Sequence, residues 1–358
     1  MRQLSMLHIE RYAGLYNLPG GRVPVIDGTP RWPWEEPAAR RRLQHIARLA
    51  GLSLTGDEPF HETTSNDTWL LSEEIVLRVC YRGDVDRFIR EAELVAALPD
   101  SVPGPQVLDY GRDQFLSWII LKRVHSTSLW EAWGRESEAV LRSYVAQLAE
   151  ILRSLHEWQP PAQILARYAA AELSETETDP TVIANDLTPL SVNHLNRLIE
   201  HAYERPYSDR DVLNRIAARL ADVAGRLVFD READVVLHGD YTPGNFLIQD
   251  GRVVTLLDFE WSRRGPRDIE LALPGYWAWL DGQEPGSGRP RFLPWLAEFY
   301  PELFDVPDLD QRQWFYRTGF ALRGLIHLPA YAPEAYLAPG HSLRQLRHLA
   351  DARQTLSL

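Results

Sequence analysis

The stretch VVLHGDYTPGNFLIQDGRVVTLLDFEW, residues 235–261, places acidic and amide side chains beside apolar runs of the kind found in buried strands. Three of its polar residues, Asp240, Asn245 and Asp258, are of types that can do chemistry together. An Asp can accept a proton from a hydroxyl group or orient that group. Amide and carboxylate oxygens also suit Mg²⁺, which takes one or two carboxylates and completes its shell with phosphate oxygens and water. The stretch therefore predicts a base and a metal site.

A hairpin would bring two of these residues together. Asp250-Gly251 separates two apolar runs and favours the type I′ turn of a two-residue hairpin. Counting back from the turn puts Asn245 opposite Leu256, so that Asp258 lies diagonally across from Asn245. Diagonal cross-strand neighbours are about 7–8 Å apart, which allows an amide oxygen and a carboxylate to reach one ion. The hairpin itself thus predicts the metal pair.

Asp240 precedes this hairpin, in a loop that contains Pro243 and Gly244. This position is near the metal pair but not on the hairpin, and it suits a base. Enzymatic phosphoryl transfer depends mainly on positioning and charge neutralisation, and it needs a base, metal ligands and a cation for the phosphates. Each residue alone is better explained as an ordinary turn residue, whereas the combination favours phosphoryl transfer.

The elements that would position these residues fall into two lobes, as expected for a chain of 358 residues. Residues 38–122 predict a small lobe made of a helix, a hairpin, a second helix and two strands. Residues 123–358 predict a larger, mostly helical lobe that contains the hairpin described above. Residues 1–37, with Gly20-Gly21 and several prolines, predict an irregular N-terminal extension. The predicted fold class is α+β.

Composition narrows the partners and the compartment. The net charge of −12 argues against nucleic acid or an anionic membrane as the main partner, and it favours cationic or neutral ligands. Cys80 is the only cysteine, which excludes an intramolecular disulfide framework and a cysteine-based zinc site. No apolar run reaches the roughly 18 residues typical of a membrane span, and no signal peptide pattern opens the sequence. We therefore expect a cytoplasmic protein.

The motif HGDYTPGN, followed by LLDFE, resembles the signature of the aminoglycoside phosphotransferase-like family, small-molecule kinases built on the protein-kinase fold. The resemblance extends over roughly residues 40–330 and shows the same order of a small mixed lobe and a large helical lobe. It implies that Asp240 is the catalytic base and that His238 supports the catalytic loop. It also implies that Asn245 and Asp258 bind Mg²⁺, within a two-lobed protein-kinase-like fold.

The same resemblance implies a phosphate-binding cation and its partner in the small lobe. The family carries a Lys or Arg on the second strand of that lobe, where the run IVLRV offers Arg78. Arg is always charged and can bind phosphate oxygens through two donors. The following helix would supply an acid to pair with this cation, Glu91 in REAEL, with Glu93 as the alternative. The residues alone leave open which face of the strand Arg78 occupies.

Further nucleotide contacts are implied by position. The segment ETTSNDTW would cover the phosphates, and its Ser65 and Asn66 resemble the short turn of the family, although the segment lacks glycines. The hinge would follow FLSWIILKRV, where backbone groups of Leu121, Lys122 and Val124 would face adenine.

Three more acids follow Asp258 in the stretch FEWSRRGPRDIELA. In the family an Asp before LA steadies the catalytic loop, and here Asp268 and Glu270 are both candidates for that role. The sequence leaves the position of the Glu260 side chain open. It could lie near a second metal ion or the acceptor, or it could face solvent.

The acceptor site would be walled by helices of the large lobe. Candidate lining residues from the segments LPGYWAWLDG and QRQWFYRTGF are Tyr276, Trp277, Trp279, Asp281 and Trp314. Aromatic walls can stack on a sugar or surround a quaternary ammonium group, whereas a polycationic aminoglycoside would favour more acids than these segments contain. The alternative is that these side chains pack the core, which is the commoner role for any one of the 12 tryptophans.

Together these observations predict an ATP- or GTP-dependent phosphotransferase that uses Mg²⁺ and phosphorylates a hydroxyl group of a small molecule. The acceptor classes considered are antibiotics such as aminoglycosides or macrolides, sugars and amino alcohols. A catalytically silent kinase-like scaffold and a metal-dependent hydrolase are the alternatives. The presence of both base and metal residues disfavours the first, and the isolated His238 disfavours the second. The oligomeric state, the nucleotide preference and the role of the extension stay open.

Overall fold

The computed structural model describes residues 25–26, 29–30, 36–61, 66–81, 84, 86–114, 116–185, 191–205, 208–227, 234–282, 291–327 and 342–352. Most of the extension at 1–37 lies outside them, apart from the paired strands β1 (Val25–Ile26) and β2 (Thr29–Pro30). The chain divides into two compact units. The first unit comprises Met1–Leu98 and Gly104–His125, and the second comprises Pro99–Pro103 and Ser126–Leu358.

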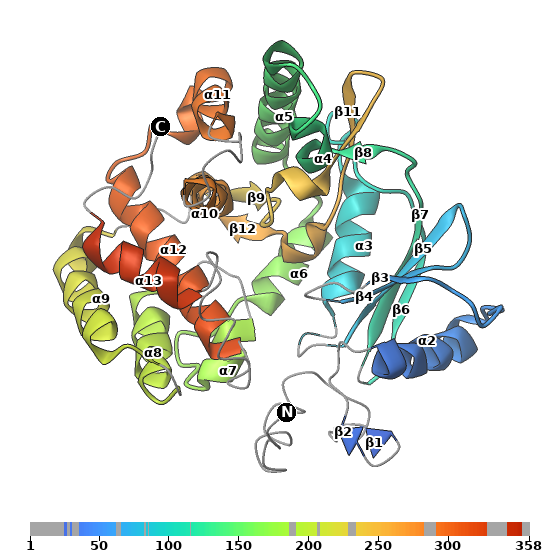
Figure 1. Cartoon of the computed structure of the whole chain (residues 1–358), viewed down its shortest axis with the longest axis horizontal. Helices are drawn as coiled ribbons and strands as arrows, with labels where there is room; N and C mark the ends of the chain where they lie inside the picture. Colours follow the sequence, from blue (N-terminus) through green and yellow to red (C-terminus); the bar gives the residue numbers. More distant parts are fainter. Residues whose placement is uncertain are drawn as a thin grey trace. The chain divides into compact units, whose positions relative to one another are not determined.

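The first unit is built on a five-stranded antiparallel sheet with the strand order β3-β4-β5-β7-β6 (Figure 1). The strands are β3 (Phe60–His61), β4 (Asp67–Leu70), β5 (Ile75–Cys80), β6 (Val107–Arg112) and β7 (Ser117–Lys122). Strands β4 and β5 form the predicted hairpin, in which Leu70 pairs with Val76. The helices of the unit are α2 (Glu36–Ala50) and α3 (Arg87–Ala97). The predicted order of elements is confirmed, and the short strand β3 is an addition to it.

The two faces of this sheet pack against different helices because side chains alternate along each strand. Leu77 of β5 packs in the apolar cluster that contains Leu43 of α2. Cys80 of β5 packs in a separate cluster that contains Phe88 of α3. Arg78 shares the face of Cys80, because the two positions are two residues apart on one strand. The fold thereby directs Arg78 toward α3.

The second unit is mainly helical. Its helices are α4 (Leu129–Trp133), α5 (Glu138–Glu157), α6 (Ala162–Ala171), α7 (Pro180–Asn185), α8 (Val192–Tyr203), α9 (Arg210–Val223), α10 (Ala272–Asp281), α11 (Phe292–Phe299), α12 (Leu309–His327) and α13 (Ser342–Asp351). Its strands are β8 (Thr127–Ser128), β9 (Val235–Leu237), β10 (Phe246–Gln249), β11 (Arg252–Leu256) and β12 (Arg263–Gly265). They form a sheet of order β11-β10-β8 and a separate pair β12-β9. The prediction of a single hairpin in this lobe was therefore incomplete.

The amphipathic sequence that runs from Ser128 to Trp158 forms two helices. The Ser128 side chain accepts the backbone N–H of Glu131 and starts α4 with a capping box, while Gly134 ends it. Ser137 then accepts the backbone N–H of Val140 and starts α5. Each serine supplies an acceptor for N–H groups that have no partner within a new helix. Two caps so close together divide a stretch whose apolar periodicity reads as continuous.

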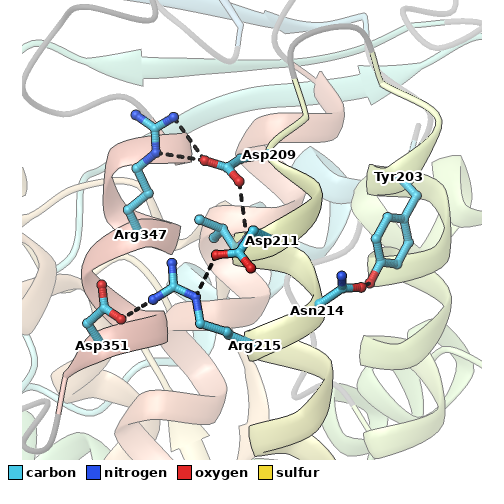
Figure 2. A network of polar contacts seen from close by, with 8 residues as sticks. Tyr203, Asp209, Asp211, Asn214, Arg215, Arg347 and Asp351 are labelled. Atoms are coloured by element: carbon cyan, nitrogen blue, oxygen red, sulfur yellow. Dashed lines mark hydrogen bonds and ion pairs between the residues drawn. The ribbon is translucent and has the colours of Figure 1, made fainter.

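Helices α7, α8, α9, α12 and α13 enclose one apolar core of the second unit (Figure 1). Polar contacts join α13 to α9 at its surface, as Figure 2 shows. Arg347 of α13 binds Asp209, the N-cap of α9, at 3.0 Å, and Asp351 pairs with Arg215 of α9. Within the described ranges, no helix combines the length and the apolar composition that a bilayer-spanning helix requires.

Candidate active site

His238 begins the loop that follows β9, and its side chain is fully buried. Its ring centroid lies 4.6 Å from that of Phe259, and its Nδ1 accepts the backbone N–H of Asp240 at 3.2 Å. Burial lowers the pKa of His238 to about 4, although a hydrogen-bonding interaction with the Leu257 backbone acts in the opposite direction. The imidazole is therefore neutral at physiological pH, and its contact holds the backbone of Asp240.

The carboxylate of Glu270 holds the same loop. Its Oε1 accepts the N–H groups of His238 and Gly239, the latter at 3.2 Å, and Oε2 lies 3.3 Å from the Gly239 nitrogen. Asp268 instead makes two hydrogen bonds to Arg312 of α12, at 2.6 and 2.7 Å. The sequence left these acids as alternatives for the contact with the loop. The structure gives that contact to Glu270 and ties Asp268 to α12.

We expect Glu270 to make folding stability depend on pH. Burial raises its pKa from 4.5 to about 7, and the charge of Asp240 also raises it, whereas the hydrogen bonds from the loop and the charge of Arg263 act to lower it. The folded state thus binds this proton more tightly than the unfolded chain does. The stabilisation is complete below the unfolded pKa and is lost as the pH rises through about 7.

Urea unfolding of wild type and Glu270→Gln at a series of pH values tests this expectation. Glu270→Gln keeps one acceptor oxygen but has no ionisable carboxyl group. Its free energy of unfolding should therefore fall less than that of wild type between pH 4.5 and pH 7. Glu270→Ala should be the less stable variant at every pH, because each buried N–H left without an acceptor costs about 1–3 kcal/mol. Equal stability of the Gln and Ala variants would contradict the role of this contact.

Gly239 is required by the backbone of the loop. Its φ is +86°, and a Cβ atom at this position would lie 2.1 Å from the carbonyl oxygen of Trp261. A main-chain atom held by the neighbouring turn cannot move aside as a flexible side chain would. The loop therefore depends on glycine for both its conformation and its close approach to 259–261.

Gly239→Ala is expected to lower the free energy of unfolding by on the order of 2 kcal/mol or more. Gly225→Ala is the matched control, because a Cβ there meets nothing within 4 Å and its φ is not positive. Denaturant unfolding of both variants measures the difference. Equal effects of the two substitutions would show that Gly239 is not constrained.

Asp240 and Asn245 are joined by hydrogen bonds. The Asn245 Nδ2 donates to the Asp240 carboxylate at 3.0 Å and to the Asp240 carbonyl oxygen at 2.9 Å. The segment between them closes through the N–H of Asn245, which donates to the carbonyl of Thr242 at 2.9 Å. Because the Asn245 Nδ2 makes two hydrogen bonds to Asp240, the orientation of the Asn245 side chain is fixed. The amide oxygen, Oδ1, is the atom that is not directed at Asp240.

The hairpin is present, but its register differs from the predicted one. Asp250 and Gly251 both have positive φ, 49° and 78°, which confirms the type I′ geometry of the turn. A bulge then shifts the pairing, because Leu247 faces Thr255 while Ile248 faces Val253. Val254 is the extra residue.

The bulge changes which residue lies across from Asn245. The Asn245 carbonyl oxygen accepts the N–H of Leu257 at 2.8 Å, so Asn245 is opposite Leu257 rather than Leu256. Asp258 therefore directly follows the residue opposite Asn245, whereas the predicted register put it two residues beyond that position. Bulges re-aim the side chains that follow them, which sequence counting cannot anticipate.

Asp258 lies in the left-handed region, with φ 64° and ψ 48°, where it begins the 3₁₀ turn Phe259–Trp261. Among the residues that the structure describes, no three His, Cys, Asp or Glu side chains form a metal-binding group. The residues that would hold a metal ion here are Asn245, through its amide oxygen, and Asp258, through its carboxylate. This oxygen donor set fits Mg²⁺, which typically takes one or two carboxylates and leaves other positions to phosphate oxygens and water.

In the first unit, Arg78 and Glu91 form the predicted pair. Nη1 of Arg78 lies 3.1 and 3.3 Å from the two carboxylate oxygens of Glu91 on α3, and both residues are buried. The guanidinium also lies 4.9 Å from the centroid of the Phe88 ring. The pair settles the face of Arg78, and Glu91 is the acid of α3 that binds it.

The structure describes four of the other five residues predicted to contact the nucleotide, and it gives them different environments. Ser65 lies outside the described residues, and Asn66 is 3 % exposed, so its side chain is largely withdrawn from solvent. Leu121 pairs within β7 with Val76 on one side and Val107 on the other. The Lys122 N–H donates to the carbonyl of Gln106 at 2.9 Å and is not available to adenine. Of the three hinge residues, Val124 alone lies beyond the strand.

The predicted acceptor residues separate into two groups. Trp314 is fully buried in the core of α12, and its Nε1 donates to the Leu349 carbonyl at 3.0 Å, so it cannot line an acceptor site. Tyr276, Trp277 and Trp279 of α10 are half-buried. The Asp281 side chain lies outside the described residues, and Glu260 is 6 % exposed, which rules out the solvent-facing alternative.

Trp130 of α4 belongs with the aromatic residues of α10 and was not predicted. Its ring contacts that of Trp277, with centroids 5.0 Å apart and an edge-on geometry. The run SLWEAW marks it only as part of a helix, and nothing in the sequence indicates that α4 meets α10.

The chain matches the model of a known protein family. The model of the phosphotransferase enzyme family matches residues 57–292, well over half of the chain. No curated protein matches the chain significantly.

Solved structures share the fold at low sequence identity. The GDP and kanamycin complex of APH(2″)-IIia is 16% identical, with a TM-score of 0.61 over 87% of this chain and 98% of that one. ADP-bound aminoglycoside phosphotransferase APH(2″)-Ib is 14% identical, with a TM-score of 0.55 over 87% and 96%. A ternary complex of aminoglycoside phosphotransferase APH(4)-Ia with ADP and hygromycin B is 15% identical, with a TM-score of 0.55 over 86% and 97%.

These likenesses confirm the predicted α+β, two-lobed kinase-like fold. The match over residues 57–292 shows that the chain belongs to the phosphotransferase enzyme family.

Proposed function

We propose that this enzyme transfers the γ-phosphoryl group of ATP or GTP to a hydroxyl group of a small molecule, with Asp240 as the base and Mg²⁺ held by Asn245 and Asp258. The similar structures bind GDP with kanamycin or ADP with hygromycin B, which supports a nucleoside triphosphate as donor and a hydroxylated compound as acceptor. Antibiotics, sugars and amino alcohols are the acceptor classes that this chemistry admits.

The observation that carries the proposal is the pair of hydrogen bonds from the Asn245 amide to Asp240, at 2.9 and 3.0 Å. They couple the proposed base to the proposed metal ligand. The bulge in β11 adds Asp258 as the residue next to the partner of Asn245. His238 and Glu270 hold the backbone before Asp240 from buried positions. A loop that only joined two strands would not need so many polar groups withdrawn from water.

The residues of the chain divide the work as follows. Asp240 accepts the proton of the acceptor hydroxyl group while the oxygen of that hydroxyl attacks the γ-phosphorus. The bond between the γ-phosphorus and the leaving nucleoside diphosphate breaks. The amide of Asn245 keeps the Asp240 carboxylate in one orientation throughout. Mg²⁺, when bound, neutralises charge on the phosphates. Arg78, oriented by Glu91, supplies a second, permanent positive charge for phosphate oxygens.

Arg78→Ala is expected to raise the nucleotide KM by on the order of tenfold and to change kcat less, because one charge-assisted phosphate contact contributes about 1.5–3 kcal/mol at most. Arg78→Lys should fall between wild type and Ala, since it keeps the charge but loses the planar fork. Arg112→Ala, which removes an exposed ion pair with Asp86 in the same unit, is the control. Initial rates at varied nucleotide concentration measure all four proteins, and an unchanged KM in Arg78→Ala would refute the assignment.

A catalytically silent nucleotide-binding protein is the alternative, and it predicts nucleotide binding without transfer. The decisive experiment incubates the full-length enzyme with Mg²⁺, γ-labelled ATP or GTP and pools of hydroxylated antibiotics, sugars and amino alcohols. The proposal predicts a labelled small-molecule product from at least one pool, formed by wild type and not by Asp240→Asn. Binding of nucleotide with no labelled product from any pool favours the silent alternative.

A further inference from the structure

The side chain of Gln147 on α5 binds the outer edge of strand β11. Its Nε2 donates to the carbonyl oxygen of Gly251 at 3.2 Å, and its Oε1 accepts the N–H of Val253 at 3.0 Å. Strand β11 is the end strand of the sheet of order β11-β10-β8, so this edge faces away from β10. The amide group therefore satisfies main-chain groups that a further strand would otherwise bind.

The bulge at Val254 lies between two fixed points on this outer edge. Before the bulge, Gln147 binds the N–H of Val253. After the bulge, the N–H of Leu256 donates to the carbonyl oxygen of Pro103 at 2.8 Å. In a regular strand the N–H groups that point to one edge are two residues apart, whereas those of Val253 and Leu256 are three residues apart. The two contacts therefore enclose the one extra residue of the strand.

The extra residue is also held from within the strand. A bulge leaves its additional residue out of the ladder, so the main-chain groups of that residue need other partners. The Thr255 hydroxyl donates to the carbonyl oxygen of Val254 at 2.6 Å, and Thr255 is only 4 % exposed. This buried hydroxyl group therefore supports the bulged register, in which Thr255 faces Leu247.

The register set by this bulge determines where Asp258 lies. The N–H of Leu257 donates to the carbonyl oxygen of Asn245 at 2.8 Å, and Asp258 follows Leu257 directly. Without the extra residue, Asn245 would face Leu256, and alternation would turn the side chains after the bulge to the opposite face of the strand. Asn245 and Asp258 are the proposed Mg²⁺ ligands, so the bulge decides whether their oxygen atoms can reach one ion.

The same turn of α5 also holds the catalytic loop. Tyr241 is fully buried and follows Asp240, and its hydroxyl group donates to the carbonyl oxygen of Leu148 at 2.8 Å. Leu148 is the residue next to Gln147 on α5, a helix of 20 residues. One helix therefore fixes both the loop that carries the proposed base and the strand that leads to a proposed metal ligand.

We propose that Gln147 is a positioning residue for the Mg²⁺ site. Because it holds Gly251 and Val253, it confines the extra residue of β11 to position 254 and so gives Asp258 its place relative to Asn245. The inference rests on the proposed function and adds to it a residue that acts through the main chain of β11. Residues that orient metal ligands without binding the ion typically change metal affinity by about 10–100-fold when they are removed.

Amide hydrogen exchange of the full-length protein, measured by NMR without nucleotide or Mg²⁺, tests the hold on the bulge. In Gln147→Ala the amides of Val253 and Leu257 should exchange about tenfold faster than in wild type, or more. Alanine favours helices more than glutamine does, so the substitution does not weaken α5 itself. Gln163→Ala makes the same change at an exposed position of α6 and should leave both rates unchanged. An unchanged rate at Leu257 in Gln147→Ala would overturn the inference, because the bulge would then stay in place without Gln147.

Binding of ATP and of GTP at a series of Mg²⁺ concentrations tests the effect on the metal site. Gln147→Ala should need about tenfold more Mg²⁺ than wild type for half-maximal tightening of nucleotide binding. Its kcat at saturating Mg²⁺ should stay within about threefold of wild type, a split that a general loss of stability would not produce. Thr255→Val removes the hydroxyl group that supports the bulge and should raise the Mg²⁺ requirement as well. An unchanged Mg²⁺ requirement in Gln147→Ala would overturn the inference.

The two tests separate this inference from the proposed function. If wild type shows no Mg²⁺-dependent nucleotide binding, the proposed function and the metal role of Gln147 both fail, while the exchange rates still report on the bulge. If wild type and Gln147→Ala require the same concentration of Mg²⁺, the inference fails and the proposed function stands.

Discussion

Asp240→Asn is expected to lower kcat for phosphoryl transfer by about 10²–10⁴-fold, the usual contribution of a positioned general base. The affinity for Mg²⁺-nucleotide should stay within about twofold of wild type, because the substitution is nearly isosteric. The Asn carbonyl oxygen can still accept the Asn245 Nδ2, which lies 3.0 Å from the carboxylate in the wild type. The loop should therefore keep its geometry while it loses the group that takes the proton.

Single-turnover transfer and nucleotide titration together measure this effect. Asp250→Asn is the matched control, since it makes the same chemical change in the exposed hairpin turn, where Asn also accepts a positive φ. Wild-type turnover by Asp240→Asn would remove Asp240 from the role of base. A loss of nucleotide affinity as large as the loss of kcat would instead point to a damaged loop.

Asp258→Asn is expected to abolish the Mg²⁺ dependence of nucleotide binding and to lower kcat by on the order of 10²-fold or more. Asn is the informative substitution because Asp258 has φ 64°, a conformation that Asn tolerates and Ala does not. The change removes the negative charge and leaves the backbone in place. An effect on affinity can then be ascribed to the metal rather than to the turn.

Calorimetric titration of nucleotide with and without Mg²⁺ measures this prediction. Asp308→Asn provides the control, because Asp308 also has a positive φ, 55°, and lies far along the sequence at the start of α12. Mg²⁺ should tighten nucleotide binding to wild type and to Asp308→Asn but not to Asp258→Asn. The same tightening in all three proteins would assign the metal to other ligands.

The hairpin shows how far local sequence reaches. The turn was predictable because Asp250-Gly251 suits positive φ at both positions, which is a property of two adjacent residues. The bulge at Val254 was not, because it depends on how both strands pack and leaves no mark in an apolar run. The residue types that surround the site were therefore predictable, while the register that relates Asn245 to Asp258 required the structure.

Side-chain direction set the same limit elsewhere. Arg78 lies in a strand whose two faces are both apolar, so alternation could not choose between them until α2 and α3 were placed. Asp268 and Glu270 are two residues apart in a 3₁₀ turn and face different partners, Arg312 and the catalytic loop. Trp314 is indistinguishable by type from the tryptophans of α10, yet helix packing buries it completely.

The measurement that tests the central claim most directly is the melting temperature of wild type and Asp258→Asn with ATP, GTP or neither, each with and without Mg²⁺. A ligand that binds only the folded state raises the melting temperature, by an amount that grows with ligand concentration over Kd. A phosphotransferase with the proposed site predicts a rise in wild type that needs both nucleotide and Mg²⁺, and its loss in Asp258→Asn. No rise at millimolar nucleotide, or an equal Mg²⁺-dependent rise in both proteins, would contradict the account.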